Sequence, residues 1–311
     1  QLKILHTFTI NETSAINAAE SRQTRILDAD YEKVDLASEL SQLDHLDTSE
    51  KQELLNTLNM YPVLFGGGLG LLRVKPVQLK LKPDARPKHE RAFSVPESLL
   101  CTTKKEIERL IKIGIICKSH DSEWAAPSFI QRKKTGDVRI LTDFRYLNDN
   151  LIRTPFPLPK IGDLLQRLTG FTYATALDLS MGYYHVPLAE ESTKLCTTIF
   201  PFGKFQYLRL PMGIKNSPDV FQSIINNIFG DMENVQVYLD DILIITTTGS
   251  FSNHLTLLGT VCHRLETADF RANVRKCSFA TDKLDYLGYW LTRDGLQPQP
   301  RKVEAILCLS P

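Results

Sequence analysis

The feature that most constrains this chain is a pair of adjacent aspartates, Asp240 and Asp241, inside its most apolar stretch, residues 235–245. The residues on both sides are mostly aliphatic, so the pattern predicts a strand on each side of the pair. In a regular strand two neighbouring carboxylates would face opposite sides. An apolar hairpin accommodates them only where a turn exposes them or a cation neutralises them. A plain hairpin turn and a cation site therefore both remain open at this point.

A third carboxylate, Asp178, ends a second predicted strand, residues 173–178. If the two elements are neighbours in one sheet, three carboxylates converge and favour a hard divalent cation such as Mg²⁺. Two such ions about 4 Å apart suit in-line displacement at phosphorus. A glycosidase with paired carboxylates is the competing interpretation, but it requires neither a third acid nor a basic hairpin.

Composition narrows the class of protein. Hydrophobic residues make up 42% of the chain and charged residues 23%, the balance of an ordinary soluble protein. No apolar stretch approaches the roughly 18 residues of a membrane span, and the first ten residues do not resemble a secretory signal. The six cysteines are scattered without a CxxC pair, which predicts reduced thiols in a cytosolic or nuclear protein. The chain does not begin with Met, so we expect a piece of something longer.

Charge is distributed unevenly along the chain. Residues 1–60 carry 5 Lys/Arg against 11 Asp/Glu, whereas residues 61–160 carry 19 against 10. The acidic start predicts a linker or a loosely ordered arm over residues 1–45. The basic block suits a surface that meets phosphates, although a solvated face is the alternative.

Local patterns predict the other elements. Asp47 and Glu50 form a predicted capping pair that opens a helix, and Pro218 lies in the first turn of another that runs to Phe229. Residues 74–82 alternate as an exposed strand does, and residues 102–116 have helical spacing. A hairpin with a basic tip is predicted from residues 128–132 and 138–143, and a further helix from residues 161–168.

Five motifs in order then resemble those of reverse transcriptases. Tyr238-Leu239-Asp240-Asp241 resembles their YxDD box, and residues 177–183 resemble the first carboxylate motif. Residues 139–148 match RxxxDFRxLN, residues 210–222 match LPxGxxxSPxxFQ, and residues 286–289 match the primer-grip hairpin. The ending, residues 294–306, is similar to long-terminal-repeat retrotransposon enzymes of the Gypsy type.

The resemblance implies an α+β, right-hand polymerase fold, with an antiparallel palm sheet backed by helices. Fingers are expected over residues 61–152 and 186–216, palm over 153–185 and 217–297, and the start of a truncated thumb over 298–311. Residues 1–60 would be an acidic extension. The reaction implied is RNA-directed addition of dNTPs to a primer 3′-OH by two-metal phosphoryl transfer, for replication of a retrotransposon.

The resemblance also implies roles for individual residues. Asp178, Asp240 and Asp241 would be catalytic and would hold two Mg²⁺ ions, or Mn²⁺, with the backbone of Leu179. The implied nucleotide-binding residues are Lys133, Arg139, Met181, Gly182, Tyr183, Met212, Gly213 and Lys276. Lys134 or Arg132 could replace Lys133, Tyr183 would be the steric gate against a ribose 2′-OH, and a plain surface lysine is the alternative for Lys276. The implied template and primer contacts are Arg145, Asn148, Gln222, Tyr238, Leu287 and Gly288.

The chain departs from the Gypsy pattern at two places outside the residues named above. Tyr183 is followed by Tyr184 and His185 rather than His-Gln, and Asp219 replaces a small apolar residue. Neither position belongs to the family's metal triad, so we expect no inactivation, and His185 is interpreted as structural.

The implied partners are an RNA or DNA template with a DNA or tRNA-type primer, and dNTPs, with no membrane partner. RNase H and integrase units are expected in a parent polyprotein but not in this chain, and the expected location is the cytoplasm, in a virus-like particle, or the nucleus. Without a thumb, we expect weak grip on template and primer, with affinity that falls as salt rises. The alternatives are a catalytically silent nucleic-acid-binding relic, and an assembly role carried by residues 1–60.

Overall fold

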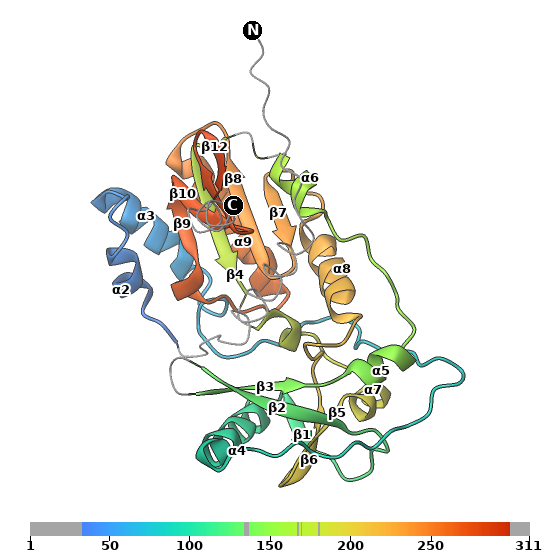
Figure 1. Cartoon of the computed structure of the whole chain (residues 1–311). Coiled ribbons are helices and arrows are strands. Elements are labelled where there is room, and N and C mark those ends of the chain that lie inside the picture. Colours follow the sequence, from blue (N-terminus) through green and yellow to red (C-terminus); the bar gives the residue numbers. More distant parts are fainter. Residues whose placement is uncertain (1–32, 134–136, 167, 169, 180, 299–311) are drawn as a thin grey trace, which may run out of the picture.

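The computed structural model describes residues 33–133, 137–166, 168, 170–179 and 181–298. Figure 1 shows two parts: one is built around a four-stranded sheet with helices α8 and α9, and the other around a five-stranded sheet. Elements far apart in the sequence alternate between the two parts, so neither part is a continuous segment of chain. The described part of the chain combines helices with mainly antiparallel sheets, the α+β class expected from the sequence. No helix in the described part of the chain is long and apolar enough to cross a membrane.

The four-stranded sheet is antiparallel and carries the aspartates. Its strands, in spatial order, are β7 (Val235–Tyr238), β8 (Asp241–Thr246), β4 (Tyr173–Asp178) and β9 (Ser278–Thr281). One face packs on α8 (Ser217–Phe229) and α9 (Phe251–Thr267), with Ile242 and Ile244 in the shared core. On the other face, Leu243 and Ile245 pack against a three-stranded sheet. Strand alternation therefore gives this sheet two apolar faces, each with its own cover.

The three-stranded sheet is formed by β10 (Lys283–Tyr286), β11 (Tyr289–Thr292) and β12 (Gly295–Pro298). The turn between β10 and β11 has two residues, Leu287 (φ 55°) and Gly288 (φ 77°). Positive φ at both positions is what a tight hairpin of right-twisted strands requires, and glycine adopts it without strain. The expected hairpin at residues 286–289 is therefore present.

The five-stranded sheet forms the other part of the molecule. Its spatial order is β1 (Ile116–Lys118), β6 (Gly203–Tyr207), β5 (Thr197–Phe200), β2 (Ala126–Arg132) and β3 (Val138–Thr142). Only the β2–β5 pair among these is parallel. Helix α4 (Glu97–Lys112) packs on this sheet. In the chain, α5 (Arg145–Asn150) follows β3, and α7 (Glu190–Leu195) precedes β5.

Two expectations for this part are corrected. The helix expected at 102–116 begins at Glu97, directly after Pro96, and ends at Lys112, with Gly114 left-handed at φ 72°. The strand expected at 74–82 is only two isolated bridges, Val77 to Leu188 and Leu81 to Leu151. Pro76 offers no N–H to a ladder, so the segment does not pair continuously.

The acidic start of the described chain is folded rather than loose, which corrects the linker expectation for residues 33–45. Helix α2 (Leu36–Ser41) precedes α3 (Thr48–Asn59), whose capping box of Asp47 and Glu50 is as predicted. Four leucines of this region are almost fully buried: Leu40, Leu46, Leu54 and Leu58. The two helices dock on η2 (Val274–Lys276) and on α9. Residues 1–32 and 299–311, including the expected thumb start, lie outside the described residues.

The remaining described elements are short. Helix α6 (Ile161–Gln166) is the helix expected at 161–168, and η1 (Gly182–His185) follows β4. The five cysteines in the described ranges are all free.

Candidate metal and nucleotide site

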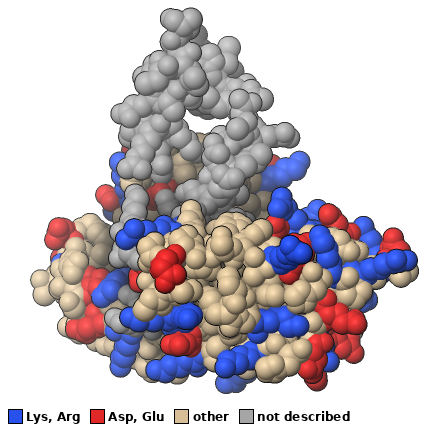
Figure 2. All heavy atoms as spheres, turned by 60° about the horizontal axis from the view of Figure 1, so that its bottom comes forward, with Lys and Arg blue, Asp and Glu red and all other residues tan. Residues whose placement is uncertain are grey.

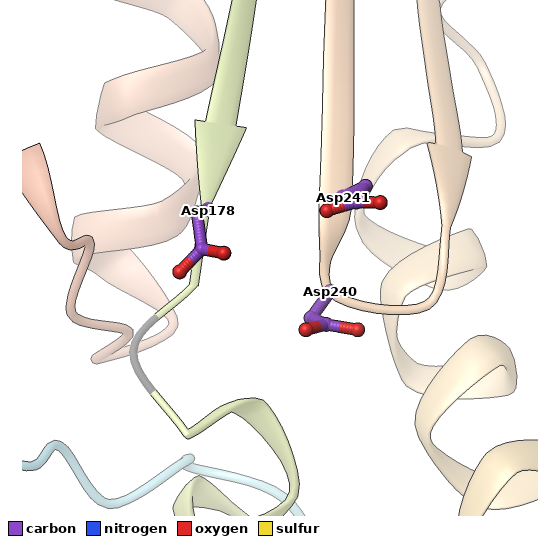
Figure 3. A group of neighbouring side chains, drawn as sticks. All are labelled: Asp178, Asp240 and Asp241. Atoms are coloured by element: carbon purple, nitrogen blue, oxygen red, sulfur yellow. The ribbon is translucent and has the colours of Figure 1, made fainter. Parts of the chain in front are cut away.

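Asp178 and Asp241 face each other across two paired strands. Asp178 is the last residue of β4 and Asp241 the first of β8, and the antiparallel register places them directly opposite. Asp240 lies beside them, and one carboxylate oxygen from each of the three residues falls within 4.8 Å of the others. Figure 3 shows the three side chains pointing into the space between the ends of the two strands.

A tight turn explains why two adjacent carboxylates can share one site. Tyr238 pairs with Asp241, so Leu239 and Asp240 form a two-residue turn, and Leu239 takes a left-handed φ of 54°. The turn removes Asp240 from the strand alternation that would otherwise place it opposite Asp241. The hairpin-turn interpretation is therefore confirmed, and the turn brings both carboxylates next to Asp178.

The sheet alternation determines which face of the molecule carries the site. Asp178 is on the same face of the sheet as Ala174 and Ala176, because residues two and four apart on a strand share a face. In the same way, Asp241 shares this face with Leu243 and Ile245. These residues belong to the face that packs on β10–β12, opposite α8 and α9. The expected primer-grip turn, Leu287–Gly288, and the partly buried Tyr238 are thus on the same side of the sheet as the aspartates.

Gln222 supports the turn with its side-chain amide. Its side-chain Oε1 accepts the Leu239 N–H at 2.8 Å, and its Nε2 donates to the Val237 carbonyl at 3.2 Å. The side chain is 2% exposed, so both ends of the amide are used inside the protein. Gln222 thus holds the backbone beside Asp240, and the template contact expected for it stays a prediction.

Asp178 has further neighbours on η2. The Lys276 ammonium lies 3.9 Å from the Asp178 carboxylate, and the Asn273 N–H donates to the Asp178 carbonyl at 3.0 Å. Lys276 therefore lies beside the aspartate cluster, and the nucleotide contact expected for it stays a prediction. No local sequence pattern predicts the Asn273 contact, because it joins the backbones of two segments far apart in the chain.

The segment after β4 packs tightly beneath the turn. Met181 is left-handed at φ 46°, and a Cβ on Gly182 would come within 2.8 Å of the Phe221 ring and 3.4 Å of Asp240 Cβ. Glycine is thus required here by packing. Tyr183 is 7% exposed, and its ring packs edge-on against that of Phe221, with 5.1 Å between the ring centroids. Leu179 is buried, and its N–H donates to the Asp240 carbonyl at 3.3 Å.

The expected phosphate ligands lie on the β2–β3 hairpin. Arg139 is directly opposite Gln131 and is 8% exposed, and the Lys133 N–H donates to the Asp137 carbonyl at 2.8 Å. Arg132 is exposed at the end of β2, and Lys134 lies outside the described residues. In the view of Figure 2, Lys and Arg side chains are spread among acidic and neutral ones and do not merge into one patch.

Asn148 and Arg145 are engaged within the protein. The Asn148 amide donates to the Gly213 carbonyl at 2.7 Å and accepts the Lys215 N–H at 2.8 Å, so it holds the loop of Met212 and Gly213. The template contact expected at Asn148 stays a prediction. The exposed Arg145 pairs with Asp143 through Nε at 2.8 Å, and this bond holds the pKa of the Asp143 carboxyl below its usual range.

The two positions that depart from the Gypsy pattern are structural. The buried Asp219 accepts the Phe156 N–H at 3.0 Å and pairs with Arg153 at 3.2 Å. His185 is fully buried, its Nε2 accepts the Arg271 N–H at 3.1 Å, and burial lowers its pKa to about 3. Both side chains are committed to backbone partners.

The donor set of the aspartate cluster fits a divalent cation. Three carboxylates offer only oxygen ligands, which hard ions such as Mg²⁺ and Mn²⁺ prefer. Three anions this close repel one another unless a cation compensates them. Asp178, Asp240 and Asp241 are thus the residues that could hold a metal in this part of the molecule.

Residues 131–291 match the family model described as reverse transcriptase (RNA-dependent DNA polymerase). The chain belongs to this reverse transcriptase family. The matched residues include all three aspartates, strands β4 and β8, and strand β10 with the turn that follows it. Reverse transcriptases generally use divalent metal ions, in agreement with the aspartate cluster.

Relatives among transposons confirm the resemblance seen in the sequence. The chain is 29% identical over 274 residues to the retrovirus-related Pol polyprotein from transposon 297 of Drosophila melanogaster, covering 85% of the chain and 26% of the relative. It is 30% identical over 231 residues to the corresponding polyprotein from transposon gypsy of the same organism, covering 72% and 22%. The chain thus spans about a quarter of the length of these relatives.

Solved structures share the fold. A foamy viral protease-reverse transcriptase in complex with double-stranded DNA aligns with a TM-score of 0.80 and 22% identity, over 89% of this chain and 49% of that one. A foamy viral protease-reverse transcriptase in complex with an RNA/DNA hybrid aligns with a TM-score of 0.78 and 22% identity, over 89% and 37%. At this identity the similarity establishes the polymerase fold.

Proposed function

We propose that this chain is the polymerase portion of a retrotransposon reverse transcriptase, which adds dNTPs to a primer 3′-OH on an RNA or DNA template. The observation that carries the proposal is the aspartate cluster. Asp178 and Asp241 lie opposite each other at the end of two paired strands, with Asp240 in the adjoining turn. Membership of the reverse transcriptase family supports the reaction type.

Asp178, Asp240 and Asp241 would hold the metal ions, with the Leu179 backbone close by. Two bound divalent cations, Mg²⁺ or Mn²⁺, would supply activation of the primer hydroxyl and stabilisation of the leaving oxygen. The protein's own contribution is to hold three carboxylates in place before the metal binds. The strand register orients Asp178 and Asp241, and the Leu239–Asp240 turn orients the third carboxylate.

The template and primer would lie across the face of the sheet that carries the aspartates. The β10–β11 hairpin packs on this face, so its Leu287–Gly288 turn suits the primer side of such a path. The structural relatives described as complexes with double-stranded DNA and with an RNA/DNA hybrid support this class of partner. Arg145, 87% exposed at its side chain, would contribute positive charge to the template side.

The incoming nucleotide would be bound between the aspartates and the β2–β3 hairpin. Arg139 and Lys133 would meet the phosphates, since a guanidinium and an ammonium suit a polyphosphate. Lys276, close to Asp178, would stabilise the leaving pyrophosphate. Met181, Gly182 and Tyr183 would line the sugar and phosphate side, and Met212 and Gly213 the base-pair side.

Primer extension on an RNA template tests the proposal. The parent chain should extend a DNA primer with Mg²⁺ and dNTPs, and Asp241→Asn should abolish extension because it removes one anionic ligand. Asp282→Asn makes the same chemical change on an exposed turn and should retain parental extension. Extension by Asp241→Asn at the parental rate would refute the metal-site assignment.

The same preparation distinguishes the alternative of a silent nucleic-acid-binding relic. A parent chain that binds an RNA/DNA hybrid but extends nothing with either Mg²⁺ or Mn²⁺ would favour the relic. Extension by the parent excludes it.

A further inference from the structure

A histidine is buried between α9 and the four-stranded sheet that carries the aspartates, where packing alone would favour an apolar side chain. His254 belongs to α9, is fully buried, and faces the sheet strands β4 and β8. Burying a polar ring is costly unless its nitrogens are hydrogen-bonded. The ring therefore has partners to be identified, and these partners indicate what it does.

Both ring nitrogens are bonded, and to different strands. Nε2 lies 2.8 Å from the Thr175 hydroxyl on β4, and Nδ1 lies 2.8 Å from the Thr246 hydroxyl on β8. Burial lowers the pKa of His254 to about 4, so the ring is neutral at pH 7, with one nitrogen donating and the other accepting. One side chain of α9 thus links two neighbouring strands from behind.

Thr175 extends this link to a third strand. Its hydroxyl also accepts the Ala280 N–H of β9 at 2.9 Å. Ala280 is left-handed at φ 45°, and the β4–β9 register is irregular at this point. The hydroxyl therefore satisfies a backbone group that the irregular ladder leaves without a regular partner.

The linked strands are the ones that carry the aspartates. Thr175 lies three residues before Asp178 on β4, and Thr246 five residues after Asp241 on β8. The register of β4 against β8 decides whether these two aspartates stand opposite each other, because a slip of one residue would turn one of them to the other face. A side chain that holds both strands acts directly on this register.

We propose that His254 is a positioning residue for the metal site, acting through Thr175 and Thr246 to hold Asp178 and Asp241 in register. The inference rests on the proposed metal-binding role of the aspartates. His254 itself touches neither aspartate and takes no part in the reaction. Its effect is to keep the carboxylates preorganised before a cation binds.

Three substitutions separate the two links. His254→Leu removes both hydrogen bonds while keeping an apolar side chain. His254→Asn places an amide near the position of Nδ1 and should keep the bond to Thr246, and His254→Gln places one near Nε2 and should keep the bond to Thr175. Leu110→Ala is the control for a general loss of stability. Leu110 is buried in α4, which packs on the five-stranded sheet and not on the four-stranded sheet that carries the aspartates.

The first measurement is amide hydrogen exchange without metal, in peptides that contain residues 177–179 and 240–242. Exchange should be faster in His254→Leu and unchanged in Leu110→Ala. The second is the Mn²⁺ dissociation constant, from the electron paramagnetic resonance signal of free Mn²⁺. It should rise about 10-fold in His254→Leu, the effect of losing an outer support of a metal site. Smaller increases are expected in His254→Asn and His254→Gln, and none in Leu110→Ala.

Parental exchange and Mn²⁺ affinity in a folded His254→Leu variant would overturn the proposal, as would equal losses in His254→Leu and Leu110→Ala. If His254→Leu does not fold, the two amide variants decide, and parental values in both would overturn it. A parent chain without Mn²⁺ affinity would refute the proposed metal site, whereas the metal-free exchange would still test the positioning role of His254.

Discussion

Gln222 shows how a side chain beside the aspartate site can support the backbone of the turn that carries one of the aspartates. It lies in a motif of the family, and the family resemblance implies a template contact for it. In the structure the amide bonds to the backbone of Val237 and Leu239 on either side of Tyr238. Gln222 therefore determines where the Leu239–Asp240 turn lies against α8.

Gln222→Met tests this support. The change keeps the side-chain length but leaves the Leu239 N–H and the Val237 carbonyl without their partner, which should cost about 1–3 kcal/mol of the free energy of unfolding. Steady-state primer extension should show kcat lower by about 10-fold or more, because the Asp240 turn loses its support. Gln78→Met, on an exposed residue, should stay within about 0.5 kcal/mol of the parent. A parental kcat for Gln222→Met would contradict the assigned role.

Tyr183 is the second residue whose role can be tested alone. If its ring excludes a ribose 2′-OH, Tyr183→Val should raise kcat/KM for a ribonucleotide relative to its deoxynucleotide by about 10-fold or more. Tyr184→Val is the control, because Tyr184 is equally buried but stacks on Tyr207. Single-nucleotide incorporation measures both ratios. Equal changes in the two variants would mean that Tyr183 is a core aromatic only.

At the scale of elements, helices α2 and α3 pack on the part of the molecule that carries the aspartates. Glu39 of α2 pairs with Arg275 of η2 at 3.2 Å, and His45 Nε2 lies 3.0 Å from the Phe279 carbonyl of β9. These contacts reach the segment that carries Lys276 beside Asp178. Of the region considered for an assembly role, the described residues 33–60 are therefore packed against the part that carries the aspartates.

Leu58→Ala tests how much this docking contributes. Leu58 is 0% exposed on α3, so the change should lower the free energy of unfolding by about 2–5 kcal/mol through lost burial and a cavity. Met60→Ala, 62% exposed just beyond the same helix, should change it by less than about 0.5 kcal/mol. Urea unfolding followed by circular dichroism measures both. Equal small effects would show that the docking of α3 contributes little to the stability of the chain.

At the scale of the whole molecule, two buried histidines couple stability to pH. Burial lowers the pKa of His185 to about 3 and of His254 to about 4, from an ordinary value of 6.5. Between about pH 6.5 and 4 the unfolded chain binds protons that the folded chain does not bind. Their contribution to stability is therefore complete above about pH 6.5 and is lost as the pH falls toward the folded pKa values.

The expected slope is about 1.4 kcal/mol of unfolding free energy per pH unit for each histidine in this range. His254→Gln should lower the slope of the parent by about that amount, because one of the two titrating groups is removed. Urea denaturation at pH values from 4.5 to 7.5 would measure it, with the exposed His120→Gln as the control for introducing glutamine. An unchanged slope in His254→Gln would mean that another group dominates the acid sensitivity.

The sequence by itself determined the features that depend on neighbouring residues. The capping box of Asp47 and Glu50, the strand that ends at Asp178 and the turn at Asp240 follow from alternation, capping and turn preferences over a few positions. The ordered motifs indicated the family, which the family match and the relatives confirmed. These inferences succeeded because each depends on a short stretch of chain.

Only the tertiary structure decided what each side chain contacts. The pairing of Asp178 with Asp241, the docking of α2 and α3, and the inward bonds of Gln222, Asn148 and His254 join segments far apart in the chain. A polar side chain has the same letter in the sequence whether it meets a substrate or a buried backbone group. Packing decides between these outcomes, because it determines which donors and acceptors lose water and must find partners inside the protein.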